Sequence, residues 1–300
     1  MKQLSENSVA NLMLYWKSIK GSYSQLRLSR DMNWQRASTD IMNDKVYIKL
    51  VLSHYEKHGR HDLSWRKRIT AYRILVSEIM LQQTQVSRVI PKFELWMKQF
   101  PTLASLRNAS LTDVLILWQG LGYQRRAKAL LRIAQHMRSL PRTYSELMAL
   151  PGIGPYTASA LCAFAYDIFP THLLETNIRT ALIEAFHQGE TDIHDGVLYD
   201  DLARLAAYPQ VRSLGARTWY YALMDYGAHL KTLRISHNAK SAHHTVQSPY
   251  EGSTRQLRAK TLFAITHNKP LPNDERIEGV LHQLLKEGYI VKKGKTFHIS

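Results

Sequence analysis

The chain has 300 residues, enough to bury one or two hydrophobic cores. Hydrophobic residues make up 45% and aromatic residues 10%, which indicates a globular protein and excludes a disordered one. The 40 lysines and arginines exceed the 24 acidic residues, and the formal net charge of +16 favours a polyanionic partner, with nucleic acid the leading candidate. No apolar run approaches the ~20 residues of a membrane helix. The single cysteine, Cys162, excludes an intrachain disulfide and an iron–sulfur cluster held by several cysteines, and it fits a cytoplasmic setting.

Residues 1–44 form a basic extension in which only residues 9–19 have the spacing of an amphipathic helix. From residue 47 onward, apolar residues recur at helical spacing, with breaks at Pro101, at residues 120–122 and at Pro141. No alternating strand of useful length precedes residue 285, so the body of the chain is predicted to be all-α. The helices with the clearest spacing are predicted over residues 71–83, 111–118 and 127–137.

The pattern changes near the C-terminus. Residues 237–252 are polar and rich in His, Ser and Pro, which predicts a linker or an extended loop. The elements predicted after it are a helix over 255–266, a turn over 270–273, a helix over 274–286 and short strands over 289–291 and 296–299. This order is typical of a small α+β, winged-helix-like module, here over residues 253–300. Such a module either contacts DNA or serves as packing.

Residues 150–155, Leu-Pro-Gly-Ile-Gly-Pro, predict a hairpin that enters a helix of small residues. The glycines at 152 and 154 allow close backbone approach, and Pro155 suits the first turn of the next helix. Amides around Gly152, Gly154 and Tyr156 then lie at a helix N-terminus, where they bind a phosphate without reading base sequence. An ordinary helix–helix turn has the same residues, and non-catalytic DNA-binding proteins also contain such hairpins. Cys162, on the buried face of the following helix, is predicted to be a small core residue.

Two carboxylates suit the breakage of a base–sugar bond, which requires protonation of the departing base and stabilisation of a cationic sugar. Glu78 lies in the otherwise apolar helix over residues 71–83, where a carboxylate is costly without a partner. Glu175 follows two leucines, where burial can perturb its pKa. The alternatives are a solvated residue on an amphipathic helix for Glu78 and a helix N-terminal carboxylate for Glu175.

These residues resemble the helix-hairpin-helix base-excision DNA glycosylases, the superfamily of endonuclease III, and most of all the adenine glycosylases of A/G mismatch repair. Besides the hairpin and the carboxylate that follows it, the matching segments are residues 63–65, 77–86, 118–123 and 224–228. The resemblance covers roughly residues 45–232. It implies a mainly α, two-lobed HhH-GPD domain over residues 45–236, with a helical barrel lobe at about 70–180 and a second lobe from 45–69 and 181–236.

The resemblance also implies catalytic roles. Glu78 corresponds to the acid that protonates N7 of a flipped adenine. Glu175 occupies the place of the family's Asp, which stabilises the cationic sugar, and Asn177 corresponds to its hydrogen-bonding partner. Tyr156 stands where bifunctional relatives carry a Schiff-base lysine, and tyrosine cannot form that imine. A monofunctional DNA N-glycosylase is therefore expected.

Further residues match parts of the family that hold DNA. Gln82 and Gln83 resemble the wedge that fills the emptied base stack, and Tyr123 resembles a residue inserted near the opposing base. Trp65 and Arg66 match residues that line the base pocket.

The resemblance implies no required cofactor, but it places K+ or Na+ on backbone carbonyls of the hairpin, here those of Met148, Leu150 and Ile153.

The sequence departs from the family in three ways. Glu175 is one methylene longer than Asp, the four cluster cysteines expected after residue 228 are absent, and no C-terminal domain that recognises 8-oxoguanine follows. The chain therefore resembles the clusterless branch.

The function expected from the sequence is hydrolysis of adenine from an A/G-type mispair, which leaves an abasic site. The expected partner is double-stranded DNA with a mismatched or damaged base, bound by a monomer in the nucleoid of the cytoplasm. Two alternatives stay open: removal of mismatched thymine or another damaged base by the same scaffold, and non-catalytic binding of DNA lesions.

Overall fold

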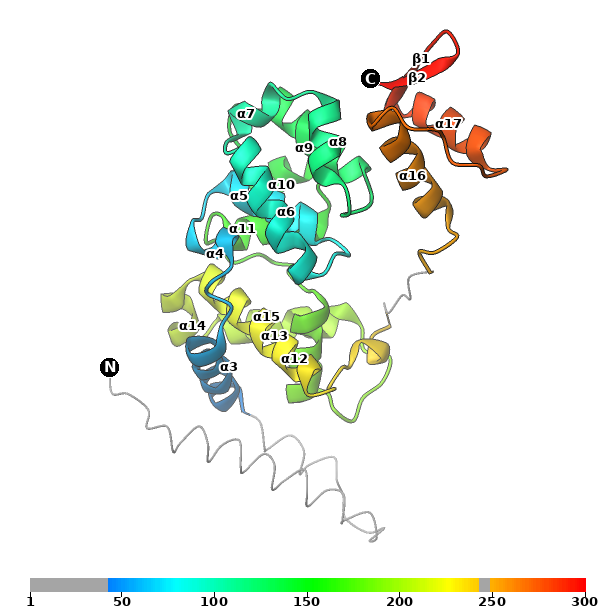
Figure 1. Cartoon of the computed structure of the whole chain (residues 1–300). Coiled ribbons are helices and arrows are strands. Elements are labelled where there is room, and N and C mark those ends of the chain that lie inside the picture. Colours follow the sequence, from blue (N-terminus) through cyan, green and yellow to red (C-terminus); the bar gives the residue numbers. More distant parts are fainter. Residues whose placement is uncertain (1–42, 243–248) are drawn as a thin grey trace, which may run out of the picture. The chain divides into compact units, whose positions relative to one another are not determined.

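The computed structural model describes residues 43–242 and 249–300, so residues 1–42 of the predicted extension lie outside the described residues. The chain divides into two compact units (Figure 1). The described residues of the first unit are 43–60 and 174–242, and those of the second unit are 61–173 and 249–300. The mainly helical fold predicted from the sequence is confirmed, and the described residues contain one sheet, a C-terminal hairpin. None of the described helices is both long enough and apolar enough to cross a membrane.

The units divide at 60/61 and 173/174, earlier in the chain than the predicted lobe boundaries at 69/70 and 180/181. Arg60 belongs to the first unit because its backbone N–H and its Nε donate to the Asp225 carboxylate at 2.8 and 2.6 Å. The short helix α4 (Ser64–Lys67) already packs on α5 of the second unit. Helical spacing is the same on both sides of such a boundary, so periodicity does not reveal where the chain leaves one unit.

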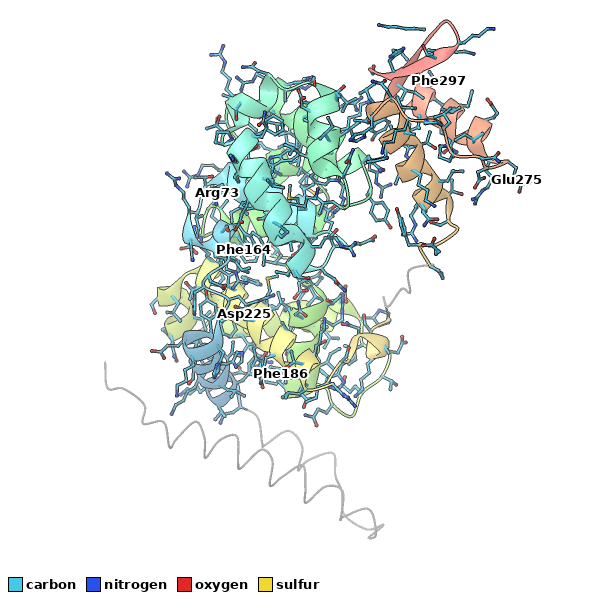
Figure 2. The ribbon with its side chains drawn as sticks, viewed as in Figure 1. Arg73, Phe164, Phe186, Asp225, Glu275 and Phe297 are labelled. Carbon is cyan, nitrogen blue, oxygen red and sulfur yellow. The ribbon has the colours of Figure 1, made fainter. Side chains whose placement is uncertain are left out.

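Helix α15 lies at the centre of the first unit and packs against both α12 and α3. The described α-helices of this unit are α3 (Asp44–His58), α12 (Thr176–Phe186), α13 (Asp195–Ala206), α14 (Pro209–Leu214) and α15 (Ala216–Thr232), with the 3-10 helix η1 at Asn238–Lys240. Their core includes the fully buried rings of Tyr47 and Trp219, and Phe186 (Figure 2) meets the Tyr47 ring edge-on with 5.0 Å between the ring centroids.

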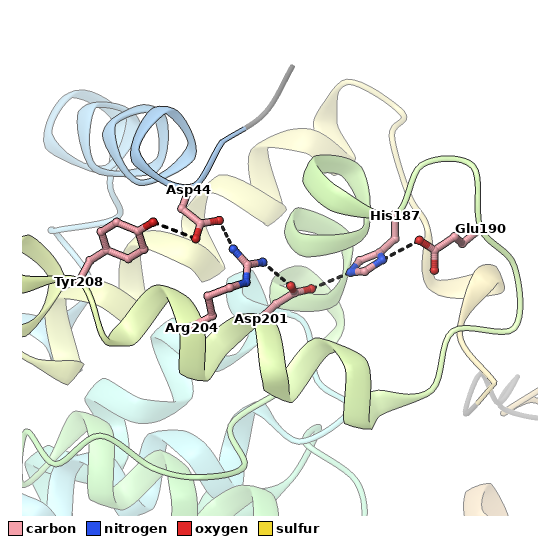
Figure 3. Close-up of polar contacts among 6 residues, drawn as sticks. All are labelled: Asp44, His187, Glu190, Asp201, Arg204 and Tyr208. Carbon is pink, nitrogen blue, oxygen red and sulfur yellow. Dashed lines mark hydrogen bonds and ion pairs between the residues drawn. The ribbon is translucent and has the colours of Figure 1, made fainter. Parts of the chain in front are cut away.

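A chain of polar contacts ties the helices of the first unit together (Figure 3). Its members are Asp44, Tyr208, Arg204, Asp201, His187 and Glu190. Arg204 forms ion pairs with both Asp44 and Asp201, and His187 contacts Asp201 at 2.6 Å and Glu190 at 3.0 Å. The hydrogen bond to Asp201 is the main reason that the pKa of His187 is raised. These polar contacts join the start of α3 to α13, so they fix helices that are distant in sequence.

Residues 237–242 pack onto the first unit, whereas the sequence pattern predicts a linker from residue 237. The N–H of Ile193 donates to Lys240 at 2.9 Å, and the N–H of Ala242 donates to Ile193 at 3.1 Å. His237 also contacts the buried Glu184 through Nε2 and Oε2 at 2.5 Å. Residues 243–248 of the predicted linker lie outside the described residues.

The helical body of the second unit surrounds a core that includes Trp96, Trp118 and Phe164, the last labelled in Figure 2. Its helices are α4, α5 (Ala71–Leu81), α6 (Val86–Gln99), α7 (Leu103–Arg107), α8 (Leu111–Trp118), α9 (Arg125–His136), α10 (Tyr144–Met148) and α11 (Pro155–Phe164). Helix α8 has the predicted bounds. Helix α5 ends before residue 83, because Gln83 has a φ of 55°, which an α-helix cannot contain.

The C-terminal module has the predicted order of elements: α16 (Thr254–Thr266), α17 (Ile277–Lys286), β1 (Ile290–Lys293) and β2 (Thr296–Ile299). The strands pair antiparallel, with Ile290 opposite Ile299. Helix α17 begins later than the predicted residue 274, because the Asp274 carboxylate accepts from the N–H of Arg276 at 2.9 Å in a turn. The module is packed on the body: Leu115 of α8 joins its hydrophobic core, which includes the fully buried Leu284.

Candidate active site

The predicted hairpin joins α10 to α11 in the second unit. Gly152 has a φ of 76°, and a Cβ at this position would lie 2.6 Å from the Cβ of Ala129, so both the backbone angle and the packing require glycine. Gly154 is the N-cap of α11 and Pro155 is its first residue. The first N–H groups of α11 have no partner within the helix, and with the helix dipole they favour an anion. The predicted helix–hairpin–helix geometry is thus present. Cys162 is buried on α11, and burial raises the pKa of its thiol, as expected for a core residue.

A buried carboxylate lies beside the hairpin helix. Glu78 projects from α5 and is 4% exposed, so the alternative of a solvated residue on an amphipathic helix is wrong. The hydroxyl of Tyr156, in the first turn of α11, donates to Oε2 of Glu78 at 3.3 Å. The structure therefore brings together two of the predicted catalytic residues, from positions far apart in the sequence.

Gln82, at the end of α5, joins the same arrangement. Its side-chain amide donates to the hydroxyl of Thr157 at 3.0 Å, one residue beyond Tyr156. Gln83 follows with a φ of 55°, and this left-handed backbone conformation turns the chain sharply after α5. The two predicted wedge residues thus lie at a tight turn that is hydrogen-bonded to the hairpin helix.

Arg126 holds this turn in place, and sequence reasoning missed it. Its guanidinium donates to the backbone carbonyls of Ile79, Gln82 and Leu121 at 2.7, 2.6 and 2.7 Å. It is 6% exposed, and burial lowers its pKa to about 10. Arg126 therefore caps the C-terminus of α5 and fixes the loop before α9. A basic residue at the start of an amphipathic helix gives no sequence sign of burial, so no signal distinguished it.

The loop between α8 and α9 has three residues in left-handed backbone conformations: Gly120, Gly122 and Tyr123, with φ values of 87°, 70° and 46°. The indole N–H of Trp118 donates to the carbonyl of Gly122 at 2.8 Å and closes the loop. The hydroxyl of Tyr123 accepts a hydrogen bond from Arg255 of α16 at 2.7 Å. The predicted DNA-contacting tyrosine is thus positioned by the C-terminal module.

The remaining predicted pocket residues of the second unit lie in α4. Trp65 is 3% exposed, and its ring meets Phe93 edge-on with 5.2 Å between the ring centroids. The neighbouring Arg66 is half-buried. Trp65 thus belongs to the core, and only a minor part of its surface is available to a ligand. The assignment of both residues to a base pocket stays a prediction.

The second carboxylate lies in the first unit, where Glu175 is the N-cap of α12 and half-buried. Its Oε1 accepts from the backbone N–H groups of Asn177 and Ile178 at 2.8 and 2.9 Å. Its Oε2 accepts from the side-chain amide of Asn177 at 3.0 Å and from the hydroxyl of Thr176 at 3.3 Å. Glu175 therefore lies at a helix N-terminus, as the alternative interpretation expected, and its predicted hydrogen bond with Asn177 is present as well.

The segment around residues 224–228 supports this carboxylate. A Cβ on Gly227 of α15 would lie 2.0 Å from the backbone oxygen of Asn177, so only glycine allows α15 to approach α12 this closely. Lys231, one turn later, donates to the hydroxyl of Thr176 at 2.9 Å. Burial lowers the pKa of Lys231, while the charge of Glu175 opposes that shift.

The hairpin carries the backbone carbonyls predicted to bind a monovalent cation, those of Met148, Leu150 and Ile153. The carbonyl of Leu150 accepts from the N–H of Ile153 at 3.2 Å, and its second lone pair remains available for a ligand. Oxygen donors of this kind suit hard cations. Within residues 43–242 and 249–300, no group of three or more His, Cys, Asp or Glu side chains has the arrangement of a metal site.

The mainly helical chain combines a helix–hairpin–helix turn beside a buried carboxylate with a second carboxylate that caps the helix after the hairpin helix. This combination defines a DNA repair protein of the helix-hairpin-helix class. The chain belongs to the HhH-GPD superfamily of base excision DNA repair proteins, whose family model matches residues 76–268. The family resemblance inferred from the motifs is thereby confirmed.

Its sequence relatives include adenine DNA glycosylases. The protein of that name from Mycolicibacterium smegmatis is 37% identical over 234 residues, which cover 71% of this chain and 78% of that protein. The one from Buchnera aphidicola subsp. Acyrthosiphon pisum is 39% identical over 150 residues, and the match spans 48% of this chain but only 43% of that protein. Among solved structures, a thermostable thymine-DNA glycosylase has a TM-score of 0.52 at 20% identity and covers 66% of this chain and 91% of its own. The last similarity shows the fold alone.

Proposed function

We propose that the protein is a monofunctional DNA N-glycosylase that releases adenine from an A/G-type mispair and leaves an abasic site. The observation that carries the proposal is the buried Glu78 carboxylate, hydrogen-bonded to Tyr156 beside the hairpin. The adenine DNA glycosylase relatives support adenine as the base. The proposed partner is double-stranded DNA, bound by a monomer in the nucleoid.

Glu78 is the proposed general acid. A carboxyl group protected from water favours its neutral form, and the neutral form carries the proton that the departing base needs. The Tyr156 hydroxyl orients Oε2 by its hydrogen bond. Protonation of the base at a ring nitrogen turns it into a neutral leaving group, so the bond to the sugar breaks without formation of a base anion.

Glu175 is the proposed electrostatic stabiliser of the sugar cation. Two backbone N–H groups and the Asn177 amide hold both of its oxygens. A negative charge fixed before reaction stabilises an oxocarbenium-like transition state without any reorganisation cost. The hydrogen bonds also fix the longer Glu side chain, whose additional methylene would otherwise add rotational freedom.

Hydrolysis is the proposed outcome because no amine stands at the hairpin helix where an imine would form. Tyr156 presents a hydroxyl at that position, and a phenol does not form a Schiff base with a sugar aldehyde. Water is therefore the proposed nucleophile, and strand cleavage is not expected to accompany base release.

DNA is proposed to bind along the hairpin through backbone N–H groups, with K+ or Na+ on the carbonyls of the same turn when bound. Gln82, Gln83 and Tyr123 are the proposed residues at the site of base extrusion, and Trp65 and Arg66 are proposed to contact the extruded base. Extrusion costs a few kcal/mol and is cheapest at a mispair, which favours mismatched substrates.

Base release from matched duplexes tests the proposal. Duplexes that carry A·G, A·8-oxoguanine, G·T or A·T at one position are incubated with the full-length protein, and free bases are separated by chromatography. We expect adenine from the A·G and A·8-oxoguanine duplexes, with strand breaks only after alkali. Glu78→Gln and Glu175→Gln should each lower the single-turnover rate by at least ~100-fold. Glu278→Gln, an exposed glutamate of α17, serves as the matched control.

The alternatives predict different products. Release of thymine from G·T without release of adenine would replace adenine as the proposed substrate. Tight binding of mismatched duplexes without release of any base, and with no difference between the wild type and the Glu78 variant, would identify a lesion-binding protein that is not an enzyme.

A further inference from the structure

The second unit contains a groove of about 1440 Å3 that the proposed chemistry does not use. One side is the loop over residues 119–125, and the other is helix α16 and the turn that follows it in the C-terminal module. Because both sides contribute, the groove exists only in a chain whose module is packed on the body, as the core shared by Leu115 and Leu284 requires.

The groove is strongly cationic. The basic residues that line it are Arg88, Arg125, Arg255, Arg258, Lys260 and Lys269, and the described lining includes one carboxylate, Glu287. Glu287 is paired with Arg258, so the remaining five cations are not balanced by acids of the lining. A surface of this kind attracts a polyanion.

Aromatic side chains lie between these cations. Tyr250 is 50% exposed and Phe263 is 40% exposed, and both line the groove. The guanidinium carbon of Arg125 lies 5.6 Å from the centre of the Tyr123 ring, and that of Arg255 lies 5.7 Å from it. Arg255 also donates to the Tyr123 hydroxyl at 2.7 Å. Cations with interleaved aromatic faces are typical of surfaces that bind nucleic acid strands.

The groove reaches the turn after α5, which is hydrogen-bonded to the hairpin helix. Gln83 lines it, and the preceding Gln82 is bonded to Thr157 of the hairpin helix. A strand that passes from the hairpin over this turn would meet the cations of the groove without leaving this unit.

We propose that this groove binds the sugar–phosphate backbone of the substrate DNA beyond the hairpin, with Arg125 of the body and Lys260 of the module as phosphate contacts. The C-terminal module is then part of the DNA-binding surface and not only a packing element. This inference rests on DNA being the substrate, as in the proposed function, but it does not depend on which base is released.

The salt dependence of binding tests this proposal. Anisotropy of a short fluorescein-labelled duplex with an A·G mispair gives Kd at a series of KCl concentrations, for the full-length wild type and for a double variant, Arg125→Gln with Lys260→Gln. The matched control is Lys293→Gln with Lys295→Gln, which removes the same charge from exposed positions of the β1–β2 hairpin outside the groove. Loss of two phosphate contacts should reduce the slope of log K against log salt by about 1.8 and weaken binding about 60-fold at about 0.1 M salt.

The outcomes separate the groove from the chemistry. A shallower slope for the groove variant, with the control variant close to wild type, supports the proposal. Equal slopes for the groove variant and the wild type overturn it, and so does an equal loss in both double variants, which would show a general effect of net charge. Base release by the wild type is measured in parallel. Its absence would refute the proposed glycosylase activity while the slopes still decide whether the groove binds DNA.

Discussion

Acidification should destabilise the first unit through His54. This histidine of α3 is 4% exposed and lies among the rings of His229, His58 and Tyr226, with ring-centroid distances of 4.6, 5.3 and 5.6 Å. Within the described part of the chain its Nδ1 has no hydrogen-bond partner. Burial, followed by the two neighbouring histidines, lowers the pKa of His54 from 6.5 to about 4, and the charge of Asp225 only partly offsets this.

The sign of the effect follows from proton binding. Between the two pKa values the unfolded chain binds a proton that the folded chain does not, so stability is fully present above pH 6.5 and is lost as the pH falls toward 4. From about pH 7.5 to about pH 5.5 the folded state should lose about 1 kcal/mol through this group. Any substitution of His54 also removes packing contacts and so lowers the free energy of unfolding at every pH. The informative quantity is therefore the change in this free energy with pH, and not its absolute value.

Urea unfolding, followed by circular dichroism at about pH 7.5 and about pH 5.5, measures this change in the free energy of unfolding. The wild type should lose about 1 kcal/mol more than His54→Gln between the two conditions. His282→Gln, at an exposed position of α17, should behave like the wild type. If His54→Gln and the wild type lose the same stability on acidification, then His54 accepts its proton in the folded state as readily as in the unfolded state, and the reasoning fails.

Two further substitutions probe the supports of the candidate site. Gly227→Ala would place a Cβ 2.0 Å from the backbone oxygen of Asn177, so it should cost roughly 2 kcal/mol or more in the free energy of unfolding and slow base release. Gly196→Ala, where an added Cβ meets nothing within 4 Å, should be neutral or stabilising in the same urea titration. Arg126→Met leaves buried carbonyls without their donor and should lower the free energy of unfolding by about 2–4 kcal/mol in calorimetry. Arg132→Met, on the exposed face of α9, is the control and should cost little. Equal Tm values for the two variants would contradict the capping role of Arg126.

Much of the candidate site was predictable because local patterns determine it. The Pro and Gly residues of the hairpin specify a turn into a helix whatever surrounds them, and α11 begins at Pro155 as expected. The apolar neighbours of Glu78 indicated burial, and the carboxylate is indeed buried. The bounds of α8 and β2 follow from strong periodicity and alternation.

What the sequence did not predict depends on contacts between distant residues. The burial of Arg126 results from carbonyls that the end of α5 and the α8–α9 loop present to it, and no spacing encodes such a meeting. Glutamate is not among the strongly preferred N-cap residues, so a helix N-terminal Glu175 followed from the sequence only as an alternative, and the two hydrogen bonds that it accepts from backbone N–H groups were not predicted individually. Helix α17 starts late because Asp274 prefers a local turn to a helical one.

The packing of the C-terminal module has a consequence for dissection of this protein. Lys128 of α9 donates to the backbone carbonyl of Gly288 at 2.7 Å, and Leu115 of α8 completes the module's apolar interior. A fragment that stops at residue 248 would leave that leucine against water and that ammonium without its acceptor. Expression of the shortened body alone should therefore yield poorly soluble material, and the smallest well-behaved form of the second unit extends to Ser300.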